Sequence, residues 1–342
     1  MFDQIKNDKI YTIAEMSANH AGSLSNALEI VRTAHEAGAD CVKIQTYTAD
    51  TMTIDCDNDY FKIKGGMWDG YKLYDLYKEA SLPWKWQQAV KDEADRVGID
   101  FLSTPFDKTS VDFLDDLGVG AYKIASFEIT DIPLLRYTAQ KQKPILLSTG
   151  MASIEEIEQA IAAIKECGNE KIVLLKCTSE YPASYENMNL AVIPDMIQRF
   201  GLPVGLSDHS MGSFADVAAV ALGAKLIEKH FCLNRKIKNP DSEFSMQPHE
   251  FAHMVKDVNN AAKLRGEVTY EHNELELANK AFRRSIFAVS DIAQGEVFTS
   301  SNIRVIRPSF GLAPVFYEEI IGKVCKKSIK RGMPLSEAEV EI

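Results

Sequence analysis

The sequence lacks a long hydrophobic run. None of its apolar stretches approaches the ~18 residues that a membrane-spanning helix requires. Its start, Met1–Lys9, is polar and lacks the apolar stretch of a secretory signal. These absences argue against a membrane protein or a membrane partner, and we expect a cytoplasmic location.

Paired cysteines and an excess of positive charge are missing as well. The six cysteines are scattered without a CxxC pair, which indicates reduced thiols in a chain of this size. Asp and Glu outnumber Lys and Arg by 49 to 38, which gives a formal net charge of −11. That balance argues against nucleic acid as a partner, so an anionic ligand would need a local basic pocket.

What the sequence does contain is typical of a globular protein, with 46% hydrophobic and 25% charged residues. From residue 10 to about residue 265, short apolar runs alternate with stretches of helical periodicity. The runs have the character of buried strands. There are eight of them: Ile10–Ser17, Cys41–Thr46, Phe101–Thr104, Ala121–Ser126, Ile145–Thr149, Ile172–Thr178, Pro203–Ser207 and Lys225–Phe231.

The stretches between these runs predict helices with recognisable ends. Ser153 is a typical helix start, and Gly98 and Gly168 are typical residues after a helix end. The predicted helices are Leu24–Ala37, Trp84–Val97, Thr109–Leu117, Ile132–Gln140, Ile154–Cys167, Leu190–Phe200, Phe214–Leu222 and His249–Leu264. Eight strand–helix units match a closed parallel (β/α)₈ TIM barrel. An open doubly wound sheet is the alternative, but no GxGxxG turn follows any of the runs.

One long loop interrupts the short connections, because Ala49–Leu82 separates the second run from its helix. It carries glycines and aromatic residues in Gly65–Gly70 and Leu73–Tyr77. An insertion of this kind after a barrel strand is expected to lie over the substrate mouth. A packed surface flap is the alternative.

After the barrel, the pattern changes to short strands and turns. We divide the chain into a barrel domain at 1–266, a polar linker at 267–282 and a small β-rich domain at 283–342. A weak repeat runs through the tail, because Ile292–Gly295 and Ile329–Gly332 are similar and lie 37 residues apart. The repeat predicts a compact pseudo-symmetric module, and we expect so small a module to dock on something.

Barrel enzymes place their working groups at the carboxyl ends of the strands. His209 closely follows the seventh run, and His230 lies at the end of the eighth. Two neutral imidazoles there would suit a divalent metal such as Mn²⁺, Zn²⁺, Fe²⁺ or Co²⁺. Two hydrogen-bonded core histidines, or a His/Cys site that includes Cys232, are the alternatives.

Other strand ends carry basic and acidic residues. Lys43, Lys123 and Ser148 are placed to converge on a phosphate or a carboxylate, although each lysine alone would also suit a salt bridge. Glu15 and Glu128 would supply acid–base function or pair with those lysines. Lys176 and Lys123 are also candidates for the Schiff-base lysine of a metal-independent barrel aldolase.

Together these motifs resemble the sialic acid synthase family. The resemblance covers essentially the whole chain, in order, and rests on Ala14-Glu15, Asn19-His20, Val42–Thr46, Ser103–Phe106, Tyr122–Ile124, Leu147–Met151, Cys177-Thr178, Tyr181-Pro182, Leu206–His209 and Glu228–His230. In the tail, Ile306–Pro308 and Gly311-Leu312 look like the family's antifreeze-like (SAF, β-clip) domain.

Within the family, Gly65–Trp68, Leu73–Ala80 and Arg307–Pro314 look most like the branch that makes pseudaminic acid. That resemblance implies a transferase that condenses phosphoenolpyruvate with 2,4-diacetamido-2,4,6-trideoxy-altrose and water, giving a nine-carbon 2-keto acid and phosphate. Other branches make legionaminic or N-acetylneuraminic acid. Flagellin glycosylation is an expected use of the product, and a surface polysaccharide is the alternative destination.

The resemblance also implies roles for single residues. His209 and His230 match a divalent metal site, with Mn²⁺ expected first and Mg²⁺ or Co²⁺ as alternatives. The positions around phosphoenolpyruvate are matched by Lys43, Thr104, Lys123, Ser148 and Ser207. Sugar-side or acid–base positions are matched by Glu15, Gln45, Glu128, Tyr181 and Asp241. Arg307 matches an arginine that the tail inserts into the neighbouring subunit's site, which implies a domain-swapped homodimer.

One position departs from the family pattern. Where N-acetylneuraminate synthases have Asn after Cys-Thr, this chain has Ser179, followed by Glu180. The departure argues against N-acetylneuraminate as the product. A carbohydrate-binding module without catalysis is a further alternative, and phosphate release from phosphoenolpyruvate would separate the two.

Overall fold

The structure is a computed structural model that describes residues 9–341. The chain divides into two compact units, Met1–Gly266 and Glu267–Ile342. The expected cytoplasmic location rests partly on the polar start of the chain. Met1–Asp8 of that start lies outside the described residues. Within residues 9–341, no helix combines the length and the apolar character needed to cross a membrane.

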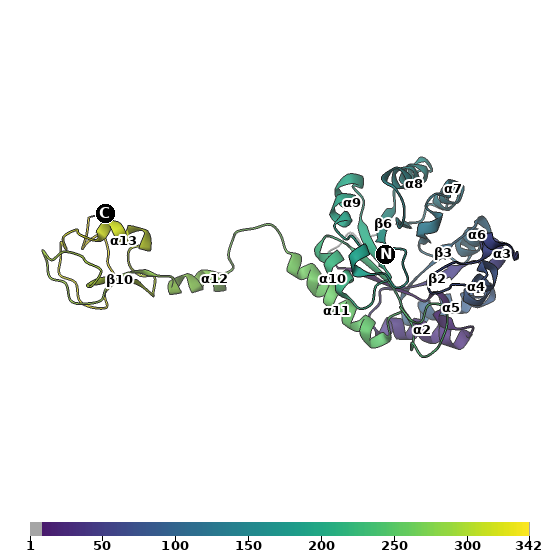
Figure 1. Cartoon of the computed structure of the whole chain (residues 1–342), viewed down its shortest axis with the longest axis horizontal. Helices are drawn as coiled ribbons and strands as arrows, with labels where there is room; N and C mark the ends of the chain where they lie inside the picture. Colours follow the sequence, from purple (N-terminus) through teal and green to yellow (C-terminus); the bar gives the residue numbers. More distant parts are fainter. Residues whose placement is uncertain (1–8, 342) are drawn as a thin grey trace. The chain divides into compact units, whose positions relative to one another are not determined.

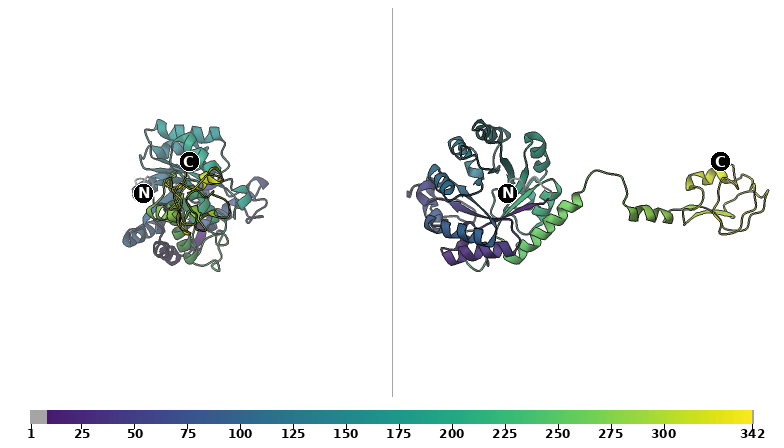
Figure 2. Two further views of the ribbon diagram at one scale, coloured as in Figure 1. Left: turned by 90° about the vertical axis from the view of Figure 1, so that its left-hand side faces the viewer. Right: turned by 180° about the vertical axis from the view of Figure 1, so that it is seen from behind.

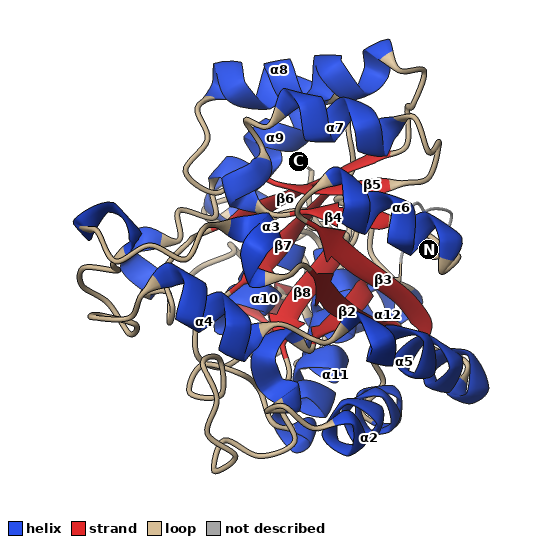
Figure 3. Cartoon of the chain, turned by 90° about the vertical axis from the view of Figure 1, so that its right-hand side faces the viewer, coloured by secondary structure: helices blue, strands red, loops and turns tan. Residues whose placement is uncertain are grey.

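Eight parallel strands form a closed barrel in the first unit, because β8 pairs with β1. Figure 3 shows these strands inside a ring of helices. The strands are β1 Tyr11–Glu15, β2 Cys41–Thr46, β3 Asp100–Pro105, β4 Tyr122–Ile124, β5 Ile145–Ser148, β6 Ile172–Cys177, β7 Val204–Asp208 and β8 Leu226–His230. The predicted TIM barrel is thereby confirmed, and each of the eight apolar runs overlaps one strand.

Each strand is followed by a helix that packs on the outside of the barrel (Figures 1 and 2). The helices are α2 Leu24–Glu36, α5 Trp84–Val97, α6 Lys108–Asp116, α7 Ile132–Ala139, α8 Ile154–Glu166, α9 Val192–Phe200, α10 Phe214–Ala221 and α11 Pro248–Arg265. The expected start of α8 is a capping box, in which Ser153 and Glu156 satisfy each other's backbone N–H groups. The apolar faces of the eight helices pack against the strands and form most of the hydrophobic core with them.

The barrel interior changes from apolar to polar along the strands. Near the strand starts it holds a separate apolar cluster, which includes Tyr11, Leu146 and Leu226. Alternation then brings polar side chains inward at the carboxyl ends, as Leu226, Glu228 and His230 illustrate along β8. Gly205 lies where the interior has no room for a side chain, since a Cβ there would be 2.6 Å from the Leu226 carbonyl oxygen.

The prediction of a continuous loop between β2 and α5 is wrong in part. This segment contains α3 Ala49–Met52, η2 Asp59–Phe61 and α4 Leu73–Ala80. The α4 helix buries only Leu76, so tertiary packing contributes little to it. Residues 53–72, between α3 and α4, contain no fully buried residue.

In the second unit, a short helical segment precedes the β-rich module. The helical segment comprises α12 Glu274–Asn279 and η5 Lys280–Phe282. The module contains β9 Ser285–Ala288, β10 Ile303–Ile306, η6 Pro314–Phe316 and α13 Tyr317–Ile320. Strands β9 and β10 pair antiparallel. The short helices were not predicted, because residues 267–282 were expected to form a polar linker and residues 283–342 to form strands and turns.

The predicted repeat corresponds to a pseudo-symmetric pairing inside this module. Ile292 and Ile329 form an antiparallel bridge with each other. Gly295 donates its N–H to the Cys325 carbonyl, and the corresponding bond 37 residues on joins Gly332 to Ala288. The two halves therefore exchange equivalent backbone hydrogen bonds around a shared apolar core.

Candidate active site

A polar pocket with about 70 Å³ of free space opens at the carboxyl ends of the barrel strands. Nine residues singled out in the sequence line it: Lys43, Gln45, Thr104, Lys123, Ser148, Tyr181, Ser207, His209 and His230. The closed barrel explains the convergence, because all parallel strands end at the same rim. Glu15, Glu128 and Asp241 lie beside this pocket rather than among its lining residues, and Arg307 belongs to the other unit.

Four buried charges form one cluster here, in which Lys43, Lys123 and Glu228 line the floor of the pocket and Glu15 lies beside it. The Lys123 ammonium donates to both carboxylate oxygens of Glu228 at 2.7 and 2.9 Å. Lys43 forms an ion pair with Glu15 and lies 3.7 Å from Glu228. The Ser207 hydroxyl donates to Glu228 at 2.9 Å. Burial opposes ionisation of Glu228, yet Lys123 and Lys43 lower its pKa to about 2, so this carboxylate is charged and fixes both lysines.

The floor also presents groups suited to an anion. The buried Ser148 hydroxyl has no hydrogen-bond partner among the described residues. Lys43 donates to the Thr104 hydroxyl at 3.3 Å. Two ammonium groups and a free hydroxyl within one small pocket can bind a phosphate or a carboxylate. Such a ligand would satisfy the buried hydroxyl, which is otherwise costly to leave unpaired.

The two histidines meet at the wall of the pocket, with their ring centroids 5.4 Å apart. The Nδ1 atom of His209 is 3.0 Å from the Thr178 carbonyl oxygen, so that ring donates from Nδ1 and leaves Nε2 available as a ligand. His230 Nδ1 is buried without a hydrogen-bond partner in the described chain. Burial and the neighbouring His209 lower the pKa of His230 well below its ordinary value, which favours the neutral imidazole that a metal needs.

This donor set fits a divalent metal bound by two protein ligands. Across residues 9–341, no group of three or more His, Cys, Asp or Glu side chains has the arrangement of a metal site. Two imidazoles would leave the other coordination positions to water and substrate, as catalytic metals require. Cys232, the alternative ligand, is buried against the Ser245 carbonyl and does not line the pocket.

Glu128 and Asp241 flank the pocket on different sides. Glu128 ends the short turn η3 Ser126–Glu128 after β4, where burial and the nearby charge of Asp131 raise its pKa to about 7. Asp241 accepts a hydrogen bond from the Ala18 N–H at 3.1 Å and lies 3.9 Å from His230 Nδ1. Burial raises the pKa of Asp241 as well. Both carboxyls are thus poised to hold a proton near the site.

Replacing Glu128 by glutamine is expected to stabilise the protein at about pH 8. Folding raises the pKa of this carboxyl, so its ionisation destabilises the folded state at any pH above the pKa that it has in the unfolded chain. The loss of stability therefore grows between about pH 4.5 and pH 7 and then stays constant. The gain in free energy of unfolding is expected to be at most about 3 kcal/mol at pH 8 and close to zero near pH 4. Urea unfolding at both pH values measures it, with exposed Glu158→Gln as the control. Equal effects at both pH values would contradict the assignment.

Two residues of the site were missed in the sequence. Glu228 was noted as an interior charge needing a partner but was not placed in the site, although Lys123, Lys43 and Ser207 all contact it. Cys177 lines the pocket, 3.9 Å from His209 Nδ1. Burial would raise the pKa of this thiol, but the His209 contact lowers it to about 7. The inward alternation along β6 was the signal that could have identified it.

The departing positions Ser179 and Glu180 have different environments. A Cβ on Gly150 would come within 2.5 Å of the Ser179 hydroxyl, so Ser179 fills the corner that this glycine leaves open. Glu180 is exposed and accepts hydrogen bonds from Asn187 within its own loop.

Lys176, the alternative Schiff-base lysine, donates to the Cys177 carbonyl and does not line the pocket. The structure therefore gives no support to a Schiff base at Lys176.

A buried ion group fixes the backbone beside both histidines. Lys229 forms ion pairs with Asp208 and with Asp216 of α10, and it donates to the carbonyl oxygens of Ser210 and Gly212. All three charged side chains are almost fully buried. Since Asp208 precedes His209 and Lys229 precedes His230, this ion group holds the two strand ends in place from the outer side of the barrel.

Replacing Lys229 by methionine is expected to lower the free energy of unfolding by about 3–5 kcal/mol, because the buried Asp208 carboxylate would lose its cation. Chemical denaturation measures this loss. Lys238→Met is the matched control, since Lys238 pairs with Glu243 at the surface and both side chains are mostly exposed. A surface pair of this kind contributes at most about 1 kcal/mol. Similar losses in both variants would refute the role of the buried ion group.

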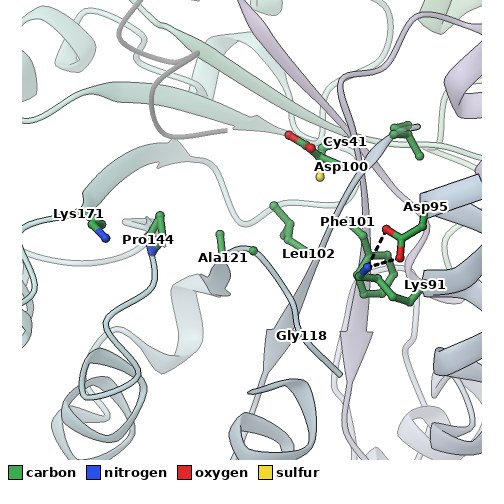
Figure 4. Close-up of a pocket in the computed structure, with 12 residues that line it drawn as sticks. Cys41, Lys91, Asp95, Asp100, Phe101, Leu102, Gly118, Ala121, Pro144 and Lys171 are labelled. Carbon is green, nitrogen blue, oxygen red and sulfur yellow. Dashed lines mark hydrogen bonds and ion pairs between the residues drawn. The ribbon is translucent and has the colours of Figure 1, made fainter. Parts of the chain in front are cut away.

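A larger cavity of about 470 Å³ lies at the opposite, amino-terminal end of the strands (Figure 4). It is lined by strand starts such as Asp100 and Ala121 and by a Lys91–Asp95 ion pair near its edge. Barrel enzymes carry their chemistry at the carboxyl ends. The smaller, charged pocket is therefore the candidate active site.

Arg307 follows β10 in the second unit and is exposed there. An exposed guanidinium in this module is available to an anionic ligand or to another subunit. Its predicted role in a neighbouring site stays a prediction.

Comparisons with known proteins found two matching family models and several similar proteins. Residues 30–270 match the model of the NeuB family, and residues 283–341 match that of the SAF domain. The pseudaminic acid synthase of Campylobacter jejuni subsp. jejuni serotype O:2 is 46% identical over 97% of this chain and 97% of its own length. The N,N'-diacetyllegionaminic acid synthase of Legionella pneumophila is 36% identical over 97% of this chain and 94% of its own.

A solved structure gives the same assignment. An N-acetylneuraminic acid synthetase from Leptospira borgpetersenii serovar Hardjo-bovis, crystallised with citrate, is 32% identical, with a TM-score of 0.72 over 79% of this chain and 90% of that one. The expected family and the expected SAF domain are thereby confirmed. This chain belongs to the NeuB family and carries a SAF domain at its C-terminal end.

Proposed function

We propose that this protein condenses phosphoenolpyruvate with 2,4-diacetamido-2,4,6-trideoxy-altrose and water to give pseudaminic acid and phosphate. The observation that carries the proposal is the 46% identity to a pseudaminic acid synthase over nearly the full length of both chains. The pocket of lysines and histidines at the barrel rim supports it, because both substrates need the groups found there.

Phosphoenolpyruvate would bind on the floor of the pocket. Its phosphate and carboxylate are anions, and Lys43, Lys123 and Ser148 are the donors able to pair with them. Thr104 and Ser207 supply further hydroxyls at the same strand ends. Glu228 keeps the two ammonium groups charged and in position before the anion arrives.

In the reaction, C3 of phosphoenolpyruvate forms a bond with the aldehyde carbon of the open-chain sugar. The aldehyde oxygen gains a proton and becomes a hydroxyl group, and a water molecule adds its oxygen to C2. The bond between C2 and the phosphate oxygen then breaks, leaving the keto group and inorganic phosphate. Glu128, with a pKa of about 7, is the group we assign to hold the transferred proton. Holding both reactants in one closed site contributes roughly 7–11 kcal/mol to such a step.

His209 and His230 would hold a divalent metal, with Mn²⁺ expected before Mg²⁺ or Co²⁺. Such an ion, when bound, supplies Lewis-acid polarisation of the aldehyde oxygen. Treatment with a chelator is expected to abolish activity, and Mn²⁺ is expected to restore it. Isothermal titration of the stripped protein with Mn²⁺ gives a second readout. Full activity in the stripped protein would remove the metal from the proposal.

The choice among sugars is tested with a substrate panel. We expect phosphate release to be fastest with the altro-configured diacetamido sugar. The corresponding precursors of legionaminic and N-acetylneuraminic acid are expected to react with at least about tenfold lower kcat/KM, because each would lose about one good contact in the transition state. A preference for either of these precursors would assign the chain to another branch.

We further propose a homodimer whose SAF domains exchange sites, so that Arg307 of one subunit contacts the substrate of the other. The proposal is supported by the exposed Arg307 and by the small size of its module. Mixing inactive Arg307→Ala and His209→Ala proteins is expected to restore about a quarter to a half of the activity per active site after subunit exchange. No recovery in a proven mixed dimer would exclude exchange. A cytoplasmic location and use of the product in flagellin glycosylation complete the proposal.

A further inference from the structure

The segment between α3 and α4 ends in a narrow flap, residues 61–72, whose tip carries Trp68. Lys62 and Lys72 form an antiparallel bridge at its base, and Ile63 donates its N–H to the Tyr71 carbonyl at 2.9 Å. Gly65 and Gly66 make the turn with positive φ values of 82° and 77°, which favour glycine. The flap therefore presents one large aromatic side chain from a tight turn.

Trp68 contacts two other loops of the barrel rim. Its ring packs on Tyr181, with 5.5 Å between the centroids, and its Nε1–H donates to the Pro240 carbonyl at 3.3 Å. Tyr181 in turn packs on the ring of His209 at 4.3 Å. Pro240 precedes Asp241, which lies 3.9 Å from His230 Nδ1. One side chain on the flap thus braces the loops that stand next to both histidines.

The pocket behind this wall is too small for the proposed substrates. Its free space is about 70 Å³, whereas ligand pockets usually measure roughly 300–1,000 Å³. The strand ends on the floor are fixed by the barrel and by buried ion pairs. In the described segment 53–72, by contrast, no side chain is fully buried, and such segments open at low cost in free energy. Tyr181 in the wall and the flap that packs behind it are therefore the parts that must move.

We propose that Trp68 is a positioning residue for the sugar half of the reaction. The flap opens to admit the substrates, and on closing, Trp68 holds the Tyr181 ring against His209 and ties down the loop before Asp241. The inference rests on the proposed function, since it concerns the sugar side of that site. Trp68 does not line the pocket itself, so it acts through Tyr181 and the Pro240 carbonyl.

The test compares three variants of the full chain in steady-state kinetics. Trp68→Ala is expected to raise KM for the sugar about tenfold or more, because an aromatic contact and a hydrogen bond are both lost. KM for phosphoenolpyruvate is expected to stay within about twofold. Trp68→Phe retains the ring contact and should recover part of the loss. Tyr60→Ala is the matched control, because Tyr60 is in the same segment and is 91% exposed.

A second measurement asks whether Trp68 acts through Tyr181. In a Tyr181→Ala background, adding Trp68→Ala is expected to raise KM for the sugar by clearly less than about tenfold, because the ring contact is already gone and only the hydrogen bond to the Pro240 carbonyl is left to lose. Additive losses, or equal rises of both KM values in Trp68→Ala, would overturn the inference.

Wild-type turnover with the sugar panel separates this outcome from failure of the proposed function. If no sugar reacts, the intrinsic fluorescence that Trp68 contributes, taken as wild type minus Trp68→Phe, still tests the contact. It is expected to shift when Tyr181 is replaced by alanine and to stay unchanged in Tyr60→Ala. An unchanged emission in both variants would overturn the contact itself.

Discussion

Replacing His230 by alanine is expected to lower kcat at least about a thousandfold, the size of effect seen when a principal electrostatic group is removed from an active site. The imidazole is buried in the pocket, and its Nδ1 makes no hydrogen bond to the described chain. The structure therefore gives it little role in holding the fold. Steady-state kinetics with saturating Mn²⁺ measures the loss.

The control for this variant is His249→Ala, because His249 is exposed on α11. It should retain wild-type kcat. Thermal unfolding of His230→Ala is expected to stay near the wild-type value. Mn²⁺ should restore the chelated wild type but not His230→Ala. A variant that keeps more than about a tenth of wild-type kcat would show that His230 is not part of the reacting centre.

Replacing Lys123 by methionine is expected to have the second large effect, on kcat/KM for phosphoenolpyruvate. The ammonium group is the closest cation to Glu228 and one of two in the pocket floor. Its removal takes away a charge that the substrate anion needs, and we expect a loss of about a thousandfold or more. It also leaves Glu228 with a more distant cation, Lys43 at 3.7 Å, which should lower the free energy of unfolding by about 3–5 kcal/mol.

A double variant separates these two effects of Lys123. Adding Glu228→Gln removes the uncompensated carboxylate, so denaturant unfolding should show that much of the lost stability returns. Activity should not return, because the substrate still lacks its cation. Lys143→Met serves as the control, since Lys143 pairs with Asp115 outside the pocket. Recovery of activity in the double variant would assign Lys123 a purely structural role.

The barrel and the floor of its pocket were accessible to sequence reasoning for a definite reason. Period-2 alternation fixes which side chains of a buried strand point inward, and closure brings the strand ends together. Lys43, Lys123, His209 and His230 follow these two rules, and the pocket collects all four. The helix α4 was also accessible, because Leu73, Leu76, Tyr77 and Ala80 have helical spacing, but this signal was overlooked.

Other features depend on contacts that no local pattern encodes. Trp68 packs on Tyr181 and bonds to Pro240, 172 positions away in the chain. The period-2 alternation does not extend to Glu128, because β4 ends at Ile124 and a short turn follows. The Glu128 carboxyl therefore lies beside the pocket rather than in it. Glu228 is a partner of the lysines only because their side chains reach across the barrel interior.

In the reaction we propose, this pocket joins phosphoenolpyruvate to an open-chain diacetamido sugar. Product analysis after incubating the wild-type protein with Mn²⁺, phosphoenolpyruvate and 2,4-diacetamido-2,4,6-trideoxy-altrose tests it most directly. We expect one phosphate released for each sugar consumed and a new compound whose mass and NMR spectrum are those of pseudaminic acid. Phosphate release without a new carbon–carbon bond, or no release with this sugar, would contradict the account.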